Sequence, residues 1–228
     1  MRRRPEARRL QDAARPWPSA AEFHPRPRDT GTNGRPVGRA FGEYWMFLRE
    51  LARAPLRTGA IAPSSAALAT LMASQIDPHA GYIVELGPGT GRLTEALLER
   101  GVPEHRLIAV EANPRFAELL AKRFPRTLLR SARAEELWRE PLPHQDEVTA
   151  VVSGIPLPAL GLQGQAAILR DWYAALPRAR GFYQFSYSPV SPVPAGRLRE
   201  WGLELTRLGA IVFNVPPAAV YRFRRNDR

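Results

Sequence analysis

The chain has 228 residues, 44% of them hydrophobic, with a formal net charge of +11 and no cysteine. This length supports one sizeable core, and the absence of cysteine excludes disulfides and thiolate catalysis. The sequence contains no apolar run of about 20 residues and no secretory leader, so we expect a cytoplasmic protein without a spanning helix. Its four scattered histidines match no metal-site spacing, and we expect no metal. A basic chain is attracted to anionic surfaces, either nucleic acid or acidic lipid.

The first 38 residues carry nine arginines, four acids and six prolines without apolar periodicity, which predicts a flexible tail. Residues 39–53 differ, because aromatic and leucine side chains recur there at helical spacing until Pro55 ends the pattern. Such a helix either packs on the core or lies in a membrane interface.

After a loop over 56–63, Ser64 is expected to cap a helix that runs to about Gln75. Strands and helices then alternate, which predicts a doubly wound α/β domain. The last two strands follow each other without a helix, which indicates an antiparallel edge pair in a mixed sheet. The predicted strands are 82–86, 106–111, 127–130, 147–153, 181–187, 207–214 and 219–224, and the predicted helices are 93–100, 116–124, 164–175 and 195–203.

A glycine-rich turn follows the first of these strands. Glu85 ends an apolar strand, Gly87, Gly89 and Gly91 follow before a helix, and Glu111 closes the next strand. Glycines there permit a tight turn and close approach of a ligand, and a carboxylate at the second strand end can accept hydrogen bonds from ribose hydroxyls. The spacing is neither the dinucleotide fingerprint nor a Walker loop. It resembles the first motif of the class I methyltransferases, which implies S-adenosylmethionine as cofactor and S-adenosylhomocysteine as product.

The methyl acceptor is expected at the end of the fourth strand, because open α/β sheets bind reacting ligands outside the carboxyl ends of their strands. Enzymes that methylate adenine usually place Asn/Asp-Pro-Pro-Tyr/Phe or Asn-Leu-Pro-Tyr there. This chain has Ser153-Gly154-Ile155-Pro156-Leu157, with leucine where the stacking ring belongs. The departure argues against a planar base, whereas an aliphatic amine needs no stacking partner.

Several segments together resemble the bacterial phospholipid N-methyltransferases, which methylate phosphatidylethanolamine stepwise toward phosphatidylcholine. The likeness covers about residues 41 to 225. It implies a class I methyltransferase (Rossmann-like) domain over 67–228, preceded by an amphipathic membrane-docking helix and cofactor-covering loop over 39–66 and by the basic tail over 1–38. It also implies a monomer, peripheral on the inner face of the cell membrane, that uses no nucleic acid. The segments that carry it are 55–65, 85–91, 153–157, 184–189 and 214–221.

The resemblance also implies individual roles. Thr58, Gly59, Ala60 and Ser64 would cover the methionine end of the cofactor, while Glu85, the three glycines and Ser153 would line its floor. Glu111 would bind the ribose, and Ala112, Ala134 and Glu135 would lie by the adenine, with Arg133 where the family has aspartate. Ser153, Gly154 and Ile155 would orient the amine, and Tyr187 or Tyr44 would face the product ammonium. The remaining expected contacts are Phe41, Trp45, Phe47 and Leu48 with the membrane, and Arg57 or Arg222 with the lipid phosphate.

Two other interpretations stay open at this point. A nucleic-acid methyltransferase of the ribosomal RNA adenine N6-dimethyltransferase type is favoured by the net charge of +11 but not by Ser-Gly-Ile-Pro-Leu. A non-catalytic lipid- or cofactor-binding module would need no acceptor site, and the full set of cofactor residues argues against it.

Overall fold

The structure is a computed structural model that describes residues 63–139, 141–187, 191–211 and 217–226. The tail, the helix predicted over 39–53 and most of the loop that follows it lie outside the described residues. The domain boundaries drawn at residues 38 and 66 therefore stay predictions.

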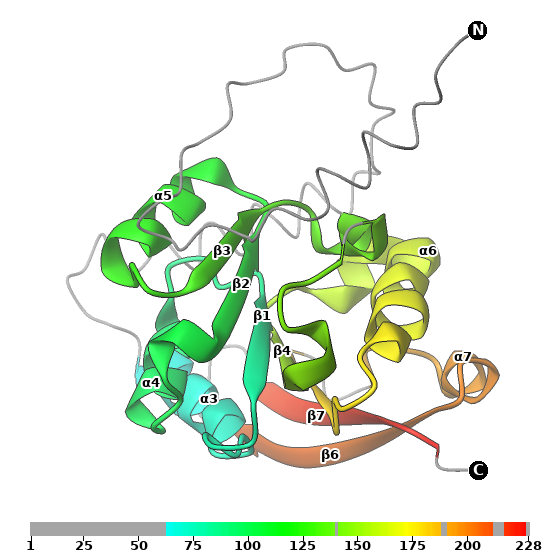
Figure 1. The fold of residues 1–228 in the computed structure, drawn as a ribbon. Helices are drawn as coiled ribbons and strands as arrows, with labels where there is room; N and C mark the ends of the chain where they lie inside the picture. The colour runs from blue at the N-terminus through cyan, green and yellow to red at the C-terminus, as the bar shows by residue number, and fades with distance from the viewer. Residues whose placement is uncertain (1–62, 140, 188–190, 212–216, 227–228) are drawn as a thin grey trace, which may run out of the picture.

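A seven-stranded mixed sheet with strand order β3-β2-β1-β4-β5-β7-β6 forms the centre of the fold (Figure 1). Strands β1 to β5 run parallel, and β7 is antiparallel to both β5 and β6. The strand order reverses between β1 and β4, and such a switch point is where open α/β sheets bind their ligands. The strands are β1 (Tyr82–Leu86), β2 (Leu107–Glu111), β3 (Leu128–Ser131), β4 (Val148–Ser153), β5 (Phe182–Ser186), β6 (Leu203–Ile211) and β7 (Ala218–Arg225).

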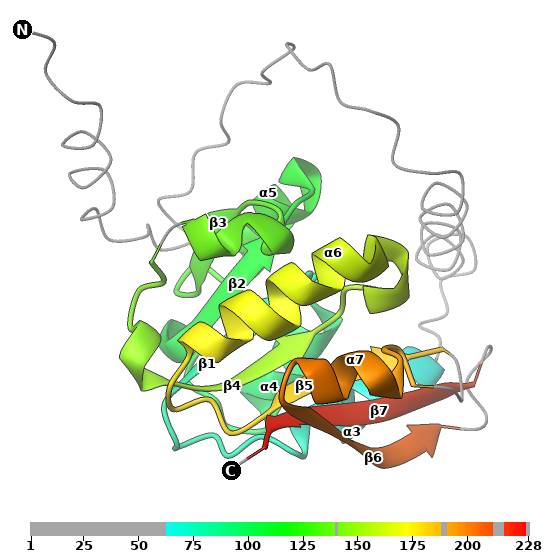
Figure 2. The same cartoon turned by 90° about the vertical axis from the view of Figure 1, so that its right-hand side faces the viewer.

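Helices cover both faces of the sheet (Figures 1 and 2). One face carries α3 (Pro63–Ala73), α4 (Arg92–Glu99) and α5 (Pro114–Arg123). The other carries α6 (Gly161–Ala166), its π-helical continuation η6 (Ala167–Trp172) and α7 (Ala195–Glu200). Short 3₁₀ turns complete the described elements: η2 (Glu104–Arg106), η3 (Ala134–Arg139), η4 (Gln145–Glu147), η5 (Leu157–Leu160) and η7 (Tyr173–Ala175).

Alternation along the strands divides the core between these two faces. In β1, Ile83 packs with α3 and α4, whereas Val84 and Leu86 pack with the α6 side. Successive side chains of a strand point to opposite faces, so apolar residues at consecutive positions require a sheet buried on both sides. Glu85 is the polar exception in this strand, and it points toward α4, where it meets Thr94.

The predicted α/β architecture and the antiparallel pair at the end of the chain are confirmed, while several boundaries were wrong. The helix predicted over 164–175 begins at Gly161, and the one predicted over 195–203 ends at Glu200. There the chain turns at Gly202, whose φ is +65°, and β6 begins at Leu203 rather than at residue 207. The pairing register of β6 with β7 shifts between Arg207 and Gly209, at Leu208. This irregularity obscures the alternation that would have shown the longer strand.

The first described helix begins one residue before the predicted cap. Pro63 is the first residue of α3, so Ser64 lies inside the helix and is not its N-cap. Proline suits this first position, because its fixed φ is helical and its missing N–H would have had no partner there.

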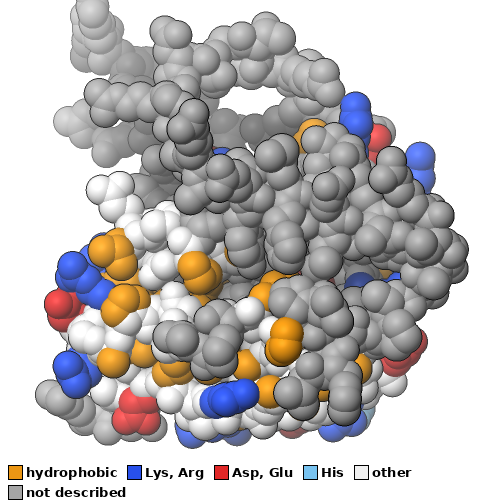
Figure 3. Space-filling view, turned by 180° about the vertical axis from the view of Figure 1, so that it is seen from behind, with side chains coloured by type: hydrophobic (Ala, Val, Ile, Leu, Met, Phe, Trp, Pro, Cys, Tyr) orange, Lys and Arg blue, Asp and Glu red, His pale blue; other side chains and the backbone are white. Residues whose placement is uncertain are grey.

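Seen from behind, the described part of the molecule has hydrophobic side chains at its surface between polar atoms and charged groups (Figure 3). Within the ranges described above, no helix is long and apolar enough to cross a membrane.

Candidate functional site

The turn after β1 has the geometry that its glycines predict. Gly87, Gly89 and Gly91 have φ values of +66°, +58° and +85°, in the left-handed region that side chains disfavour. Gly91 is also the N-cap of α4, and a Cβ there would lie 2.5 Å from the ring of Phe124. At Gly89, by contrast, no described residue lies within 4 Å of the position that a Cβ would take. The described part of the chain therefore leaves the middle of the turn uncovered.

An arginine from α5 supports this turn from one side. The Arg123 guanidinium donates to the carbonyl oxygen of Thr90 and pairs with Glu95 of α4. The same group lies 4.9 Å from the centroid of the Phe124 ring. Arg123 thus ties the turn to two helices.

The two acids predicted at strand ends both lie at the turn. One carboxylate oxygen of Glu111 accepts from the Gly89 amide at 3.0 Å, and the other accepts from the Asn113 amide at 2.7 Å. Burial raises the pKa of Glu111, and the backbone amides of Asn113, Gly89 and Ala112 oppose this rise. Each carboxylate oxygen has a second lone pair, so Glu111 can still accept from ribose hydroxyls.

Glu85 is fully buried under the turn. Its Oε2 accepts from the Thr94 hydroxyl at 2.7 Å, while its Oε1 has no partner among the described residues. Burial raises the pKa of Glu85 to about 8; the Thr94 hydrogen bond opposes the rise and the charge of Glu111 adds to it. A carboxyl group that favours its neutral form at neutral pH therefore lies beneath the predicted cofactor site.

The end of β4 lies directly against the turn after β1. The Gly154 amide donates to the Leu86 carbonyl at 2.8 Å, and a Cβ on Gly154 would lie 2.6 Å from the Gly87 carbonyl oxygen. A Cβ on Gly87 would in turn lie 2.8 Å from the Ile155 side chain. Ser153 is buried, and its hydroxyl accepts from the Ile155 amide at 3.2 Å. The structure thus brings Ser153, Gly154 and Ile155 to the glycine turn.

Gln184 is a residue to which the sequence analysis assigned no role. It lies on β5 opposite Ser153, with 1% of its surface exposed. Its amide nitrogen donates to the Ile155 carbonyl at 2.8 Å and to the Phe185 carbonyl at 2.7 Å. Its Oε1 is buried and has no partner among the described residues. The signal that could have found it is a polar side chain inside an otherwise aromatic strand, Phe-Tyr-Gln-Phe.

The stretch predicted to lie by the adenine begins beside the end of β2, where the Ala132 amide donates to the Glu111 carbonyl at 3.1 Å. Ala112 is exposed, whereas Ala134 is buried in the core. Glu135 forms an ion pair with Arg133. These residues are near the acid that was predicted to bind ribose, and their contact with adenine stays a prediction.

Other predicted site residues are more scattered. Tyr187 follows β5, is half-buried and packs edge to face on Phe185 at a centroid distance of 5.3 Å. Arg222 lies opposite Tyr183, three positions from the Ser186–Ala219 pair that marks the carboxyl end of β5. The side chain of Ser64 is not described, and the remaining predicted residues lie outside the described ranges: Phe41, Tyr44, Trp45, Phe47, Leu48, Arg57, Thr58, Gly59 and Ala60. The described ranges contain no group of three or more side chains that would hold a metal ion.

Comparisons with known proteins agree with this architecture. The 1,6-didemethyltoxoflavin-N1-methyltransferase of Burkholderia thailandensis, solved with S-adenosylhomocysteine bound, superposes with a TM-score of 0.55 at 18% identity, over 90% of this chain and all of that one. This chain has the class I methyltransferase fold.

The sequence relatives are methyltransferases of two kinds. The ornithine lipid N-methyltransferase of Singulisphaera acidiphila is 29% identical over 187 residues, which cover 78% of this chain and 94% of that protein. Ribosomal RNA small subunit methyltransferase A of a Synechococcus species is 33% identical over 121 residues, but the match spans only 36% of that protein and 52% of this chain. No family model matches the chain.

The raised pKa of Glu85 predicts how stability depends on pH. Glu85 is protonated in the folded chain up to about pH 8 but ionises near 4.5 when unfolded. Unfolding therefore releases a proton between these values, and the free energy of unfolding should fall with rising pH by up to about 1.4 kcal/mol per unit. Urea unfolding of Glu85→Gln from pH 5 to 8 should show a much flatter slope. Glu99→Gln, which changes an exposed glutamate of α4, should keep the slope of the unaltered chain; equal slopes in all three would contradict the assignment.

Proposed function

We propose that the protein transfers methyl groups from S-adenosylmethionine to the primary amine of a lipid headgroup, with phosphatidylethanolamine as the substrate and phosphatidylcholine as the end of the series. The observation that carries this proposal is the position of Leu157. Its side chain is fully buried in the core, at the place where adenine methyltransferases carry the ring that stacks on the base. A planar base would therefore lack its stacking partner, whereas an aliphatic amine needs none.

The residues at the turn fit the cofactor. The described residues leave room for a ligand against the backbone at Gly89, and Glu111 keeps lone pairs for two ribose hydroxyls. Glu111 lies at the carboxyl end of β2, where its negative charge favours a cationic ligand, while Glu85 beneath the turn favours its neutral form at neutral pH. S-adenosylmethionine, when bound, supplies a methyl group on a sulfonium centre.

The end of β4 positions the acceptor. The reaction needs a neutral amine whose lone pair points at the methyl carbon; the new N–C bond forms as the C–S bond breaks, and the amine proton passes to water. Gln184 fixes the Ile155 carbonyl through its amide nitrogen, and Ser153 fixes the Ile155 amide. Gln184 and Ser153 thus hold both backbone polar groups of Ile155 in place, and a fixed Ile155 backbone gives the amine a fixed position.

Two relatives favour different acceptors. An ornithine lipid and phosphatidylethanolamine share a primary aliphatic amine on a lipid, and the ornithine lipid enzyme matches most of this chain. The ribosomal RNA methyltransferase supports an RNA acceptor, but the match covers about half of this chain. The lipid amine is the acceptor class that both the relative with the wider match and Leu157 support.

Mass spectrometry of the products tests the substrate. The full chain would be incubated with S-adenosylmethionine and vesicles of phosphatidylethanolamine with phosphatidylglycerol, with vesicles of an ornithine lipid, and with ribosomal RNA. We expect successive mass gains of one methyl group on phosphatidylethanolamine. Methylation of the ornithine lipid alone would support a lipid amine as the acceptor but would replace phosphatidylethanolamine as the proposed substrate. Methylated RNA beside unmodified lipid would overturn the proposal.

Gln184 provides a second prediction about the acceptor. Gln184→Met keeps the volume of the side chain and removes both hydrogen bonds to backbone carbonyls, so the amine should be misaligned. We expect kcat to fall roughly 10- to 100-fold, with the KM for S-adenosylmethionine unchanged. Gln165→Met is a matched control, because Gln165 is also buried and donates to one backbone carbonyl, that of Leu157, at 3.0 Å. Equal losses of kcat in the two variants would reduce Gln184 to a structural role.

We propose in addition that residues 39–53 dock the enzyme on anionic membranes through an aromatic face that includes Trp45. Trp45→Glu replaces an apolar side chain by a negative charge, and vesicles with acidic headgroups should then sediment the protein about 10-fold less efficiently or worse. Trp17→Glu makes the same change in the predicted tail and should have a much smaller effect. If the Trp45 variant sediments like the unaltered chain, the helix does not bind the membrane.

A further inference from the structure

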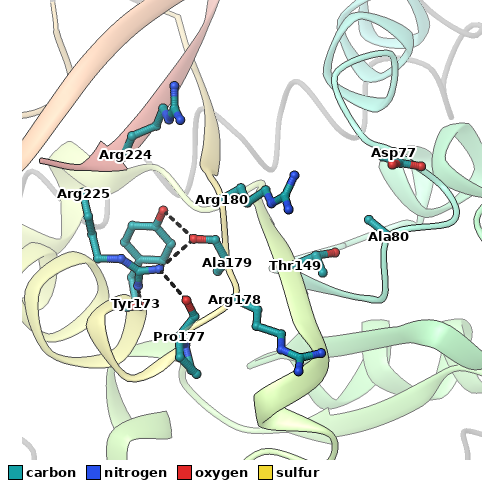
Figure 4. Close-up of a pocket in the computed structure, with 10 residues that line it drawn as sticks. All are labelled: Asp77, Ala80, Thr149, Tyr173, Pro177, Arg178, Ala179, Arg180, Arg224 and Arg225. Atoms are coloured by element: carbon teal, nitrogen blue, oxygen red, sulfur yellow. Dashed lines mark hydrogen bonds between the residues drawn. The ribbon is translucent and has the colours of Figure 1, made fainter. Parts of the chain in front are cut away.

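A cleft of about 830 Å³ lies at the amino end of the sheet (Figure 4). Its lining residues precede β1 and β5, begin β4 and end β7, so it opens at the end of the sheet opposite to the glycine turn. Four of the lining side chains are arginines, Arg178, Arg180, Arg224 and Arg225, and the one lining acid is Asp77.

Arg225 builds the wall of this cleft. Its guanidinium donates to the backbone carbonyls of Tyr173 and Leu176 at 3.1 and 3.0 Å, and to those of Pro177 and Ala179 at 3.2 and 2.9 Å. It also lies 5.0 Å from the centroid of the Tyr173 ring. One side chain thus fixes the turn that leads into β5, and this turn presents Arg178 and Arg180. The two extend toward the side of the cleft where Asp77 lies (Figure 4).

The other three arginines are free. Arg178, Arg180 and Arg224 are exposed and form no ion pair or side-chain hydrogen bond with any described residue. The nearby acids form no ion pair with them within the described ranges: Asp77 lines the cleft and accepts from the His79 amide, and Glu204 lies opposite Arg224 in the ladder. The positive field reaches Tyr173, where burial raises the pKa of the phenol and the charges of Arg225, Arg224 and Arg222 oppose that rise.

Arginine is abundant in this chain, and its described members outside the cleft include both paired residues and exposed ones, such as Arg126 and Arg207, that form no ion pair with a described residue. Arg92, Arg123, Arg133, Arg170 and Arg197 each pair with a carboxylate. The cleft differs because three guanidiniums from two segments, none paired with a described residue, line one cleft beside a rigid turn. Guanidiniums form forked hydrogen bonds with phosphate oxygens, and their planar fork loses less side-chain freedom per hydrogen bond than a lysine does.

We propose that this arginine cleft binds an anion with two or more phosphate charges, at a second site apart from the methyl-transfer site. The volume exceeds what a single phosphate fills, so a pyrophosphate or a phosphorylated organic group fits it. The inference stands on the cleft alone and does not depend on the substrate proposed above.

Calorimetry with inorganic pyrophosphate tests the site, using the full chain in about 0.15 M salt to screen distant charges. The double variant Arg178→Gln/Arg180→Gln removes two of the free guanidiniums. Arg126→Gln/Arg207→Gln removes two exposed arginines outside the cleft and makes the same change in net charge. We expect pyrophosphate affinity to fall about 10-fold or more in the cleft variant and to stay unchanged in the control.

Two competitors identify the source of the phosphate. Displacement of pyrophosphate by dihexanoyl phosphatidic acid, which is soluble, would assign a lipid headgroup to the cleft, whereas displacement by nucleotides alone would assign a free phosphorylated metabolite. Equal loss of affinity in the cleft variant and the control, or no binding of pyrophosphate, would overturn the proposal. The proposal would also be overturned if a single-stranded RNA bound tightly through the cleft arginines and pyrophosphate did not compete with it. The cleft would then be part of a nucleic-acid surface. Activity toward lipid amines is measured separately, so failure here leaves the proposed function standing.

Discussion

The close contact between the turn after β1 and the turn after β4 is the constraint on which the site depends. The Gly154 amide reaches the Leu86 carbonyl at 2.8 Å, and neither Gly87 nor Gly154 has room for a Cβ. The two turns pack backbone to backbone because both residues are glycines. A ligand on the first turn is therefore held at a fixed distance from a group bound at the second, which is what a direct transfer between two bound molecules requires.

This contact also explains why Glu85 is so deeply buried. The residue is the penultimate one of β1, an apolar strand that pairs with β2 and β4 on its two sides, and the glycine turn closes over it. Its hydrogen bond to Thr94 satisfies one carboxyl oxygen, and no described residue bonds to the other. Folding keeps this incompletely satisfied group in place, and a polar group left in that state costs stability. Such a cost is characteristic of functional sites, where the arrangement that serves a ligand differs from the one that serves the empty fold.

The sequence was sufficient for the sheet, and it failed where tertiary contacts decide. Apolar runs separated by amphipathic segments predicted the strands, since burial on both faces demands them. Glu85, the glycines and Glu111 could be placed because their roles are local to one strand end and one turn. Gln184 could not, because its partner is a carbonyl 29 residues away that becomes a neighbour only when β4 and β5 pair. The start of β6 was missed for a similar reason, as its pairing with β7 across a shifted register overrides the local pattern.

Acidic and basic side chains lie at opposite ends of the sheet, and this separation affects which ligands each end can bind. Two buried acids, Glu85 and Glu111, lie at the carboxyl ends of β1 and β2, while the cleft at the opposite end is lined by four arginines and one acid. Because the pKa of Glu85 is raised to about 8, the negative charge at the first end comes from Glu111. A cationic sulfonium is favoured there and is repelled by the arginines at the second end, where an anion is favoured instead. The net charge of +11 therefore says little about the acceptor at the carboxyl end, because the described arginines differ in what they bind. Arg225 donates to four backbone carbonyls, whereas the Arg178 side chain forms no hydrogen bond with a described residue. Which partner a basic methyltransferase attracts depends on where its unpaired guanidiniums lie and not on how many arginines it has.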